Sequence, residues 1–98
     1  MERFTEKNIG NAGGQEKYLL GEQKIELGPL GYTGEAVDRL GVFEDILEDL
    51  FAAQERLSAQ MEQLRAQGKT KSFQFRELMG KKLVNSNILS IFQTYGIL

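Results

Sequence analysis

The sequence predicts a mainly α-helical protein, in which one long helix with a heptad pattern is followed by two short helices that pack back on it. Three observations support this prediction. Apolar residues in the middle third are spaced by three and four, apolar residues near the C-terminus fall at i, i+3, i+4 and i+7, and glycine is concentrated ahead of both. The chain has 98 residues, which is the size of one domain.

The long helix is predicted over residues 35–67, which contain no proline and one interior glycine, Gly41. The next residue, Gly68, is a typical C-terminal stop. Such a helix is roughly 45–50 Å long at 1.5 Å per residue. Within the heptad pattern that starts at Leu40 and Phe43, the a and d positions form a seam. The seam consists of Leu47, Leu50, Gln54, Leu57, Met61 and Leu64.

We expect this seam to join two copies of the chain. A compact domain of about 100 residues has a radius of gyration of about 13 Å, so a helix of this length overruns it. The C-terminal segment is too short, and itself too apolar, to cover the whole seam. The simplest result is a two-fold homodimer in which the polar Gln54 layer helps to fix the register. In the alternative, a monomer, Gln54 points to solvent.

The apolar stripe of this helix changes width along its length. Val42, Ile46 and Phe51 widen it in the first half, whereas polar residues flank it in the second half. The first half is therefore expected to be buried on more than one side. The second half is expected to form a narrow seam that faces a single helix.

The C-terminal segment predicts two short helices, over residues 72–84 and 87–95. Thr70 or Ser72 is a suitable N-cap for the first helix, and Gly96 ends the second. Between them lie Asn85, Ser86 and Asn87. These side chains compete for backbone hydrogen bonds and favour caps over helix interiors, so we expect them to interrupt the helix.

Residues 1–34 predict an irregular, glycine-rich segment ahead of a helical domain over residues 35–98. Seven of the eleven glycines and the only proline lie there. Residues 18–20 and 24–27 form the two strands of a possible small β-hairpin around residues 21–23, and residues 11–14 form a flexible loop. Turns over residues 28–34 lead into the long helix, with Thr33 as its N-cap.

The composition excludes several function classes. The chain has no cysteine and no histidine, which rules out disulfides, zinc sites built from these residues and catalytic relays through imidazole. Glycines near residues 10–17, 28–34 and 68–70 do not match phosphate-loop or dinucleotide-binding spacing. We therefore expect no enzyme, no catalytic residue, no metal and no cofactor.

No membrane or secretion signal is predicted. The chain has no apolar run near the roughly 18 residues of a membrane span, and its first residues lack an apolar signal core. We expect a soluble, cytoplasmic protein.

Charge is distributed unevenly, although the net charge is only −2. Residues 35–67 contain eight acids and three bases, whereas residues 68–98 contain one acid and five bases. The two segments either neutralise each other by packing together or meet a charged partner.

Two sets of charged residues are candidates for partner binding. The acidic set lies on the long helix as two i, i+4 pairs and consists of Glu44, Asp45, Glu48 and Asp49. It is either a solvated face or a rigid acidic surface that imitates a nucleic-acid backbone and occupies a basic groove of another protein. A metal or acid–base role has no second set of ligands to support it.

The basic set lies in the C-terminal segment and consists of Lys69, Lys71, Arg76, Lys81 and Lys82. With Phe73 and Phe75 between them, these residues could contact phosphates and stack on bases, unless the phenylalanines belong to the core. Residues 78–92 also have the pattern of a helix-turn-helix motif. However, the would-be recognition helix, 87–95, has no lysine or arginine, so we expect it to be buried.

Several segments resemble a family of small proteins encoded by prophages and mobile elements of Gram-positive, mainly clostridial, bacteria. The matching segments are MERFTEKN at 1–8, EAVDRLGVFED at 35–45, KTKSFQFREL at 69–78, NSN at 85–87 and YGI at 95–97. No agreed activity and no functional residues belong to this family. The resemblance implies a mobile element in a bacterial cytoplasm, where small helical proteins often inhibit host defence complexes, anti-CRISPR proteins among them.

The expected function is therefore binding without catalysis. The first hypothesis is a homodimeric inhibitor that presents a charged helical surface to a host protein or ribonucleoprotein complex. The alternative is an accessory or regulatory protein that binds nucleic acid through residues 69–82. A third possibility is a purely structural assembly protein.

Overall fold

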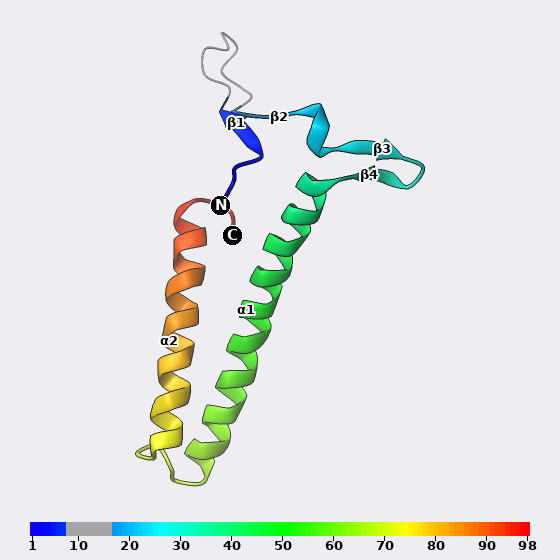
Figure 1. The fold of residues 1–98 in the computed structure, drawn as a ribbon. Helices are drawn as coiled ribbons and strands as arrows, with labels where there is room; N and C mark the ends of the chain where they lie inside the picture. The colour runs from blue at the N-terminus through cyan, green and yellow to red at the C-terminus, as the bar shows by residue number, and fades with distance from the viewer. Residues whose placement is uncertain (8–16) are drawn as a thin grey trace. The chain divides into compact units, whose positions relative to one another are not determined.

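The computed structural model describes residues 1–7 and 17–98, in two compact units, Met1–Glu44 and Asp45–Leu98. Two helices dominate: α1 spans Glu35–Ala66 and α2 spans Phe73–Thr94 (Figure 1). This confirms the mainly helical fold with one long helix. The loop predicted at residues 11–14 lies outside the described residues.

The end of α1 is set by Gly68, as the sequence predicts. Gly68 has a φ of +72°, and its amide donates to the Arg65 carbonyl. The Lys69 amide donates to the Leu64 carbonyl at 2.8 Å. This pair of bonds is a Schellman motif, which satisfies carbonyls that the helix end would leave unpaired. The chain then turns back through residues 67–72.

The second helix corrects the prediction of two short helices over 72–84 and 87–95. Ser72 is the N-cap, as expected, because its hydroxyl accepts a hydrogen bond from the Phe75 amide at 3.1 Å. From there α2 continues through residues 85–87 without a break. Ser86 accepts a hydrogen bond from the Gln54 side chain on α1, at 2.9 Å. Tertiary contacts therefore outweigh the weak helix preference of these polar residues.

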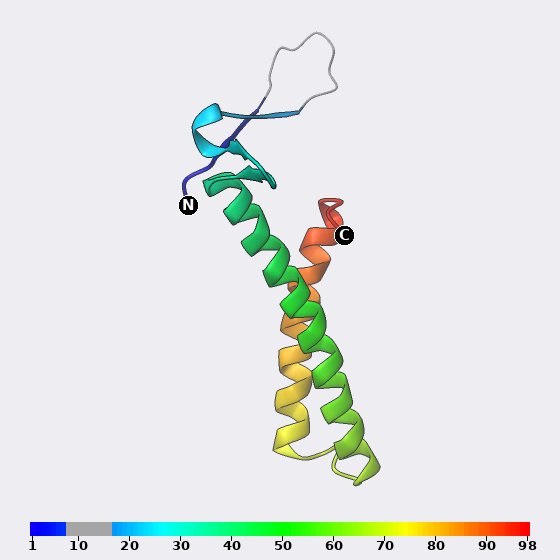
Figure 2. The same ribbon diagram turned by 90° about the vertical axis from the view of Figure 1, so that its right-hand side faces the viewer.

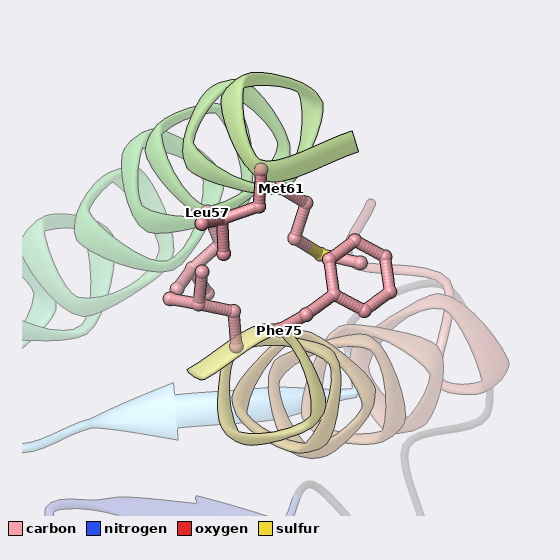
Figure 3. Close-up of a cluster of buried hydrophobic side chains, with 5 residues drawn as sticks. Leu57, Met61 and Phe75 are labelled. Carbon is pink, nitrogen blue, oxygen red and sulfur yellow. The ribbon is translucent and has the colours of Figure 1, made fainter. Parts of the chain in front are cut away.

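The hairpin of α1 and α2 has one hydrophobic core, near its connecting end. In Figures 1 and 2 the two helices run side by side in opposite directions along Asp45–Leu98. Leu57 and Met61 of α1 point toward Phe75 of α2 (Figure 3). The buried cluster consists of Leu57, Met61, Leu64, Phe75 and Leu78. The second half of α1 is thus the narrow seam that was predicted, and it faces a single helix.

Within one chain, this seam already has a partner. Leu57, Met61 and Leu64 are buried against α2, which covers the second half of the seam that we expected to join two copies. Nearer the start of α1, Leu47 and Leu50 are only half-buried. The predicted burial of the first half on more than one side is also wrong in this structure, because Val42, Ile46 and Phe51 are exposed.

The described part of the N-terminal unit contains four short strands, but they do not pair as predicted. Strand β1 (Thr5–Lys7) pairs with β2 (Tyr18–Leu20), and β3 (Glu26–Gly28) pairs with β4 (Gly31–Thr33), both antiparallel. A 3₁₀ turn, Glu22–Lys24, separates β2 from β3, so these two strands do not form the expected hairpin. The two-residue turn at Pro29 and Leu30 joins β3 to β4 instead.

The N-cap of α1 is Gly34, and not Thr33 as predicted. Thr33 is held in β4 opposite Glu26, whereas the Gly34 carbonyl accepts the first helical hydrogen bond from the Asp38 amide at 3.0 Å. Gly34 has a φ of +125°, and a Cβ there would lie 2.6 Å from the Lys24 carbonyl oxygen. Both facts require glycine at this position. The Lys24 ammonium also lies 3.0 Å from the Glu35 carboxylate, next to the same turn.

We predict that Gly34→Ala loosens the N-terminal unit, because it introduces both a backbone strain and a clash. The free energy of opening β3 and β4 should fall by about 1–3 kcal/mol. Amide hydrogen exchange of these two strands measures this free energy. Gly21→Ala is the matched control, since a Cβ at Gly21 meets nothing within 4 Å and its φ is −67°. Equal protection in the two variants would contradict the close approach at Gly34.

We also predict that Leu57→Ala destabilises the hairpin, because it opens a cavity in the only buried cluster of the described residues. The free energy of unfolding should fall by about 2–4 kcal/mol, measured by urea denaturation followed by circular dichroism. Leu83→Ala removes the same atoms from an exposed position and should cost less than about 0.5 kcal/mol. Similar costs for both substitutions would refute this core.

Candidate functional site

The four acidic candidates lie on the solvent side of α1. Glu44, Asp45, Glu48 and Asp49 are all exposed. At 100° per residue, their i, i+4 pairs are turned away from the side of the helix that carries Leu47 and Leu50. None of the four forms an ion pair with any residue that the structure describes, whereas Glu35, Glu62 and Glu77 each pair with a base.

This arrangement concentrates uncompensated negative charge on one rigid surface. The carboxylates occupy two successive turns of a continuous 32-residue helix, so their spacing is fixed by the backbone. Neighbouring carboxylates make the local electrostatic potential more negative. This potential extends about 8–10 Å into solution at physiological salt. We call these four residues the acidic face.

The basic candidates do not form one surface. Lys69 and Lys71 lie in the connection between the helices, and Arg76 follows in the first turns of α2; all three are exposed. Lys81 is paired with Glu77 at 3.4 Å. Lys82 is half-buried, and its backbone carbonyl accepts a hydrogen bond from Gln54 of α1. The structure therefore keeps only the first three together, at the connecting end of the hairpin.

The two phenylalanines near the basic set have different roles. Phe75 is buried in the hydrophobic cluster, where the Arg65 guanidinium also lies 5.7 Å from its ring centroid. Phe73 is 75% exposed, immediately after the connection. Phe73 is thus available for contact with a partner. The helix-turn-helix pattern of residues 78–92 has no structural counterpart, because α2 has no turn there.

Gln54 lies inside the hairpin, and neither alternative offered by the sequence describes it. Its side-chain amide donates to the Lys82 carbonyl at 3.1 Å and to the Ser86 hydroxyl at 2.9 Å. Its carbonyl oxygen is buried without a hydrogen-bond partner among the described residues. The polar layer therefore acts between α1 and α2 of one chain, where it disfavours a shift of one helix along the other.

Two of the depressions among the described residues are large enough to hold a small group. One, of about 420 Å³, lies in the N-terminal unit between Phe4, Leu20 and Phe43, with Arg39 at its rim. The Arg39 guanidinium is already engaged, since it stacks 3.4 Å from the Phe4 ring centroid and donates to the Glu2 carbonyl. The polar side chains among its lining residues are those of Arg3, Thr5 and Arg39.

The second depression, of about 480 Å³, is a groove on one side of the hairpin. It lies between Ile46 and Ala53 of α1 and Asn85 of α2, with Asp49 and Arg56 along its edge. The small side chains of Ala52 and Ala53 leave space there that a larger residue would fill. This groove was not predicted, because the sequence does not show that residue 85 lies opposite residue 53.

One apolar stripe of α2 was also missed. Val84, Ile91 and Tyr95 are 57%, 59% and 80% exposed, and Ile88 between them is half-buried. The sequence showed the spacing of Ile88, Ile91 and Tyr95 but assigned it to a short helix of its own. Continuing the helix back through Asn85 adds Val84 and turns the set into a heptad stripe.

Two further functions find no support in the part of the chain that the structure describes. No group of three or more aspartate, glutamate, histidine or cysteine side chains is arranged to hold a metal ion there. No helix in residues 1–7 and 17–98 combines the length and the apolar character that crossing a bilayer requires.

Comparisons with known proteins do not assign the chain to a family. No family model, no curated protein and no solved structure matches it.

Proposed function

We propose that this chain is a non-enzymatic binding protein that docks the acidic face of α1 into a positively charged groove of another macromolecule. The observation that supports the proposal most directly is that four exposed carboxylates on one helix lack ion-pair partners among the described residues. Elsewhere on the two helices, Glu35, Glu62 and Glu77 are each paired with a base. Unpaired charge on a fixed backbone is suited to an external cationic partner.

The physics of association favours such a surface. A helix that is already formed loses little conformational freedom when it binds, so more of the interaction energy appears as affinity. Complementary charge also steers the encounter and raises the association rate, chiefly at low salt. A groove that normally holds nucleic-acid phosphates is lined by lysine and arginine side chains, and these could pair with the carboxylates of the acidic face.

The narrower form of this proposal is inhibition of a host defence complex, in the manner of anti-CRISPR proteins. It rests on the resemblance to proteins of prophages and mobile elements, from which we infer a bacterial cytoplasm as the setting. The acidic face is compatible with this role, because a defence nuclease must hold nucleic acid in a basic channel.

We predict that reversing the acidic face abolishes partner binding without unfolding the protein. The variant carries Glu44→Lys, Asp45→Lys, Glu48→Lys and Asp49→Lys. Affinity for the partner that co-purifies with the tagged wild-type chain should fall by about 100-fold or more, because attraction becomes repulsion. Calorimetry with the purified partner measures the affinity, and circular dichroism checks the helix content.

The matched control reverses four exposed acids that lie outside α1 and have no ion-pair partner among the described residues: Glu2, Glu6, Glu22 and Glu26. It has the same net charge as the test variant, so it separates a local surface from a general charge effect. Equal loss in both variants, or full binding by the test variant, would disprove the acidic face as the contact.

A second candidate function is nucleic-acid binding by the connecting end of the hairpin. The observation that favours it is Phe73, which is 75% exposed beside Lys69, Lys71 and Arg76. Exposed aromatic rings stack on unpaired nucleobases, and neighbouring lysine and arginine side chains neutralise phosphates.

This second function predicts a measurable affinity for a single-stranded oligonucleotide that falls as salt rises. Phe73→Ala should then weaken binding by about 1–3 kcal/mol, measured by fluorescence anisotropy. Met79→Ala, which removes an exposed apolar side chain away from the connection, is the control. A flat titration with the wild-type chain at low salt would eliminate this function.

A further inference from the structure

We propose that a second copy of this chain docks on one side of the hairpin, over the groove between α1 and α2 and the exposed stripe of α2. This surface lies entirely within Asp45–Leu98. It differs from the seam that the sequence indicated, which α2 of the same chain covers. We call it the docking side, and it consists of Ile46, Ala53, Val84, Ile88, Ile91 and Tyr95.

The first argument is that α2 has two apolar stripes. Phe75, Leu78 and Leu89 are buried. The stripe from Val84 to Tyr95 follows the steps four, three and four, and it lies roughly 130° around the helix from Leu89 at 100° per residue. A helix with two such stripes is suited to contact two neighbouring helices, as in a four-helix bundle.

The second argument is that the groove and the stripe share one side of the hairpin. Asn85 lines the groove. Around the axis of α2, Asn85 lies between the buried residue Leu89 and the exposed stripe, so the groove opens toward that stripe. Ala52 and Ala53 leave room at its α1 wall for a side chain of another molecule. The surface therefore combines a hollow with an adjacent apolar ridge, and a two-fold partner would present the same pair of features.

The third argument is the area available. Ile46, Val84, Ile91 and Tyr95 are 46–80% exposed. At roughly 150–200 Å² for a fully exposed large side chain, they offer about 400 Å² of apolar surface. Nonpolar atoms make up a little over half of a typical interface, so this corresponds to about 700 Å² per partner. That is close to the roughly 800 Å² per partner of a stable protein–protein interface.

The fourth argument identifies the occupant as a second copy. Helix α1 carries eight acids and three bases, whereas α2 carries three bases and one acid. A two-fold axis parallel to the helices places α1 of one copy beside α2 of the other, with antiparallel neighbours throughout. That arrangement brings helices of opposite net charge together twice, while a contact between two α1 helices would bring like charges together.

Self-association would also compensate for the small core. Among the described residues six side chains are buried, and none is completely buried. The unit Asp45–Leu98 is small, and small folded units commonly gain stability by oligomerising. The docking side and the acidic face share Asp49, which lies along the groove. The two proposals can still fail separately, because a chain that binds its basic partner as a monomer would overturn the dimer alone.

The first test is sedimentation equilibrium of the full chain at about 1–100 μM. We expect the wild-type chain to be a dimer and Ile91→Glu to raise the dimer dissociation constant at least 100-fold, because a charge would be buried at the contact. Leu83→Glu is the matched control, because Leu83 is 61% exposed and Ile91 is 59% exposed. Leu83 lies on the other flank of α2, so its substitution should leave the dimer intact. A monomeric wild-type chain, or a persistent Ile91→Glu dimer, would overturn the proposal.

A second test keeps the proposal decidable should Ile91→Glu fail to fold. The chain has no cysteine, so single introduced cysteines report on contacts between copies. Under mild oxidation, a mixture of Ile46→Cys and Ile91→Cys chains should form the mixed disulfide at least ten times faster than a mixture of Ile46→Cys and Leu83→Cys chains. Equal rates in the two mixtures would refute the arrangement.

Discussion

The packing of Phe75 and Leu78 against Leu57, Met61 and Leu64 is the interaction on which the hairpin depends. Only this cluster joins α1 and α2 through buried side chains near the connecting end. Isolated helices are marginal in water, so each of these helices gains its stability from the other. The Schellman motif at Gly68 and the Ser72 cap make this packing possible, because they satisfy the helix ends while the chain reverses.

The same packing determines which surfaces remain for partners. Each helix uses one side for the other helix, and the remaining sides are exposed. On α1 the exposed side carries the acidic face, which lacks internal compensation among the described residues. On α2 it carries a second apolar stripe. A two-helix hairpin has no further layer to cover these surfaces, and the proposed binding function rests on their exposure.

Gln54 illustrates how a polar residue in an apolar seam acquires its role from its partner. Its donor bonds to the Lys82 carbonyl and the Ser86 hydroxyl, while its buried oxygen has no described partner. A shift of α2 by one residue would remove both bonds and leave the whole amide unpaired. The residue thus favours one register of the hairpin at some cost in stability. It also explains why Ser86, a residue with weak helix preference, lies inside α2.

The sequence by itself determined the length and end of α1, the seam spacing, the Ser72 cap and the Gly96 end of α2, because these depend on local periodicity and cap chemistry. It also located the exposed acids. Tertiary structure alone decided that α2 is continuous, that the seam is closed within one chain and that β3 pairs with β4 and not with β2. These outcomes depend on contacts between residues far apart in the chain, such as Gln54 with Ser86. The energy of such contacts exceeds the helix and strand propensities of individual residues, on which predictions from sequence depend.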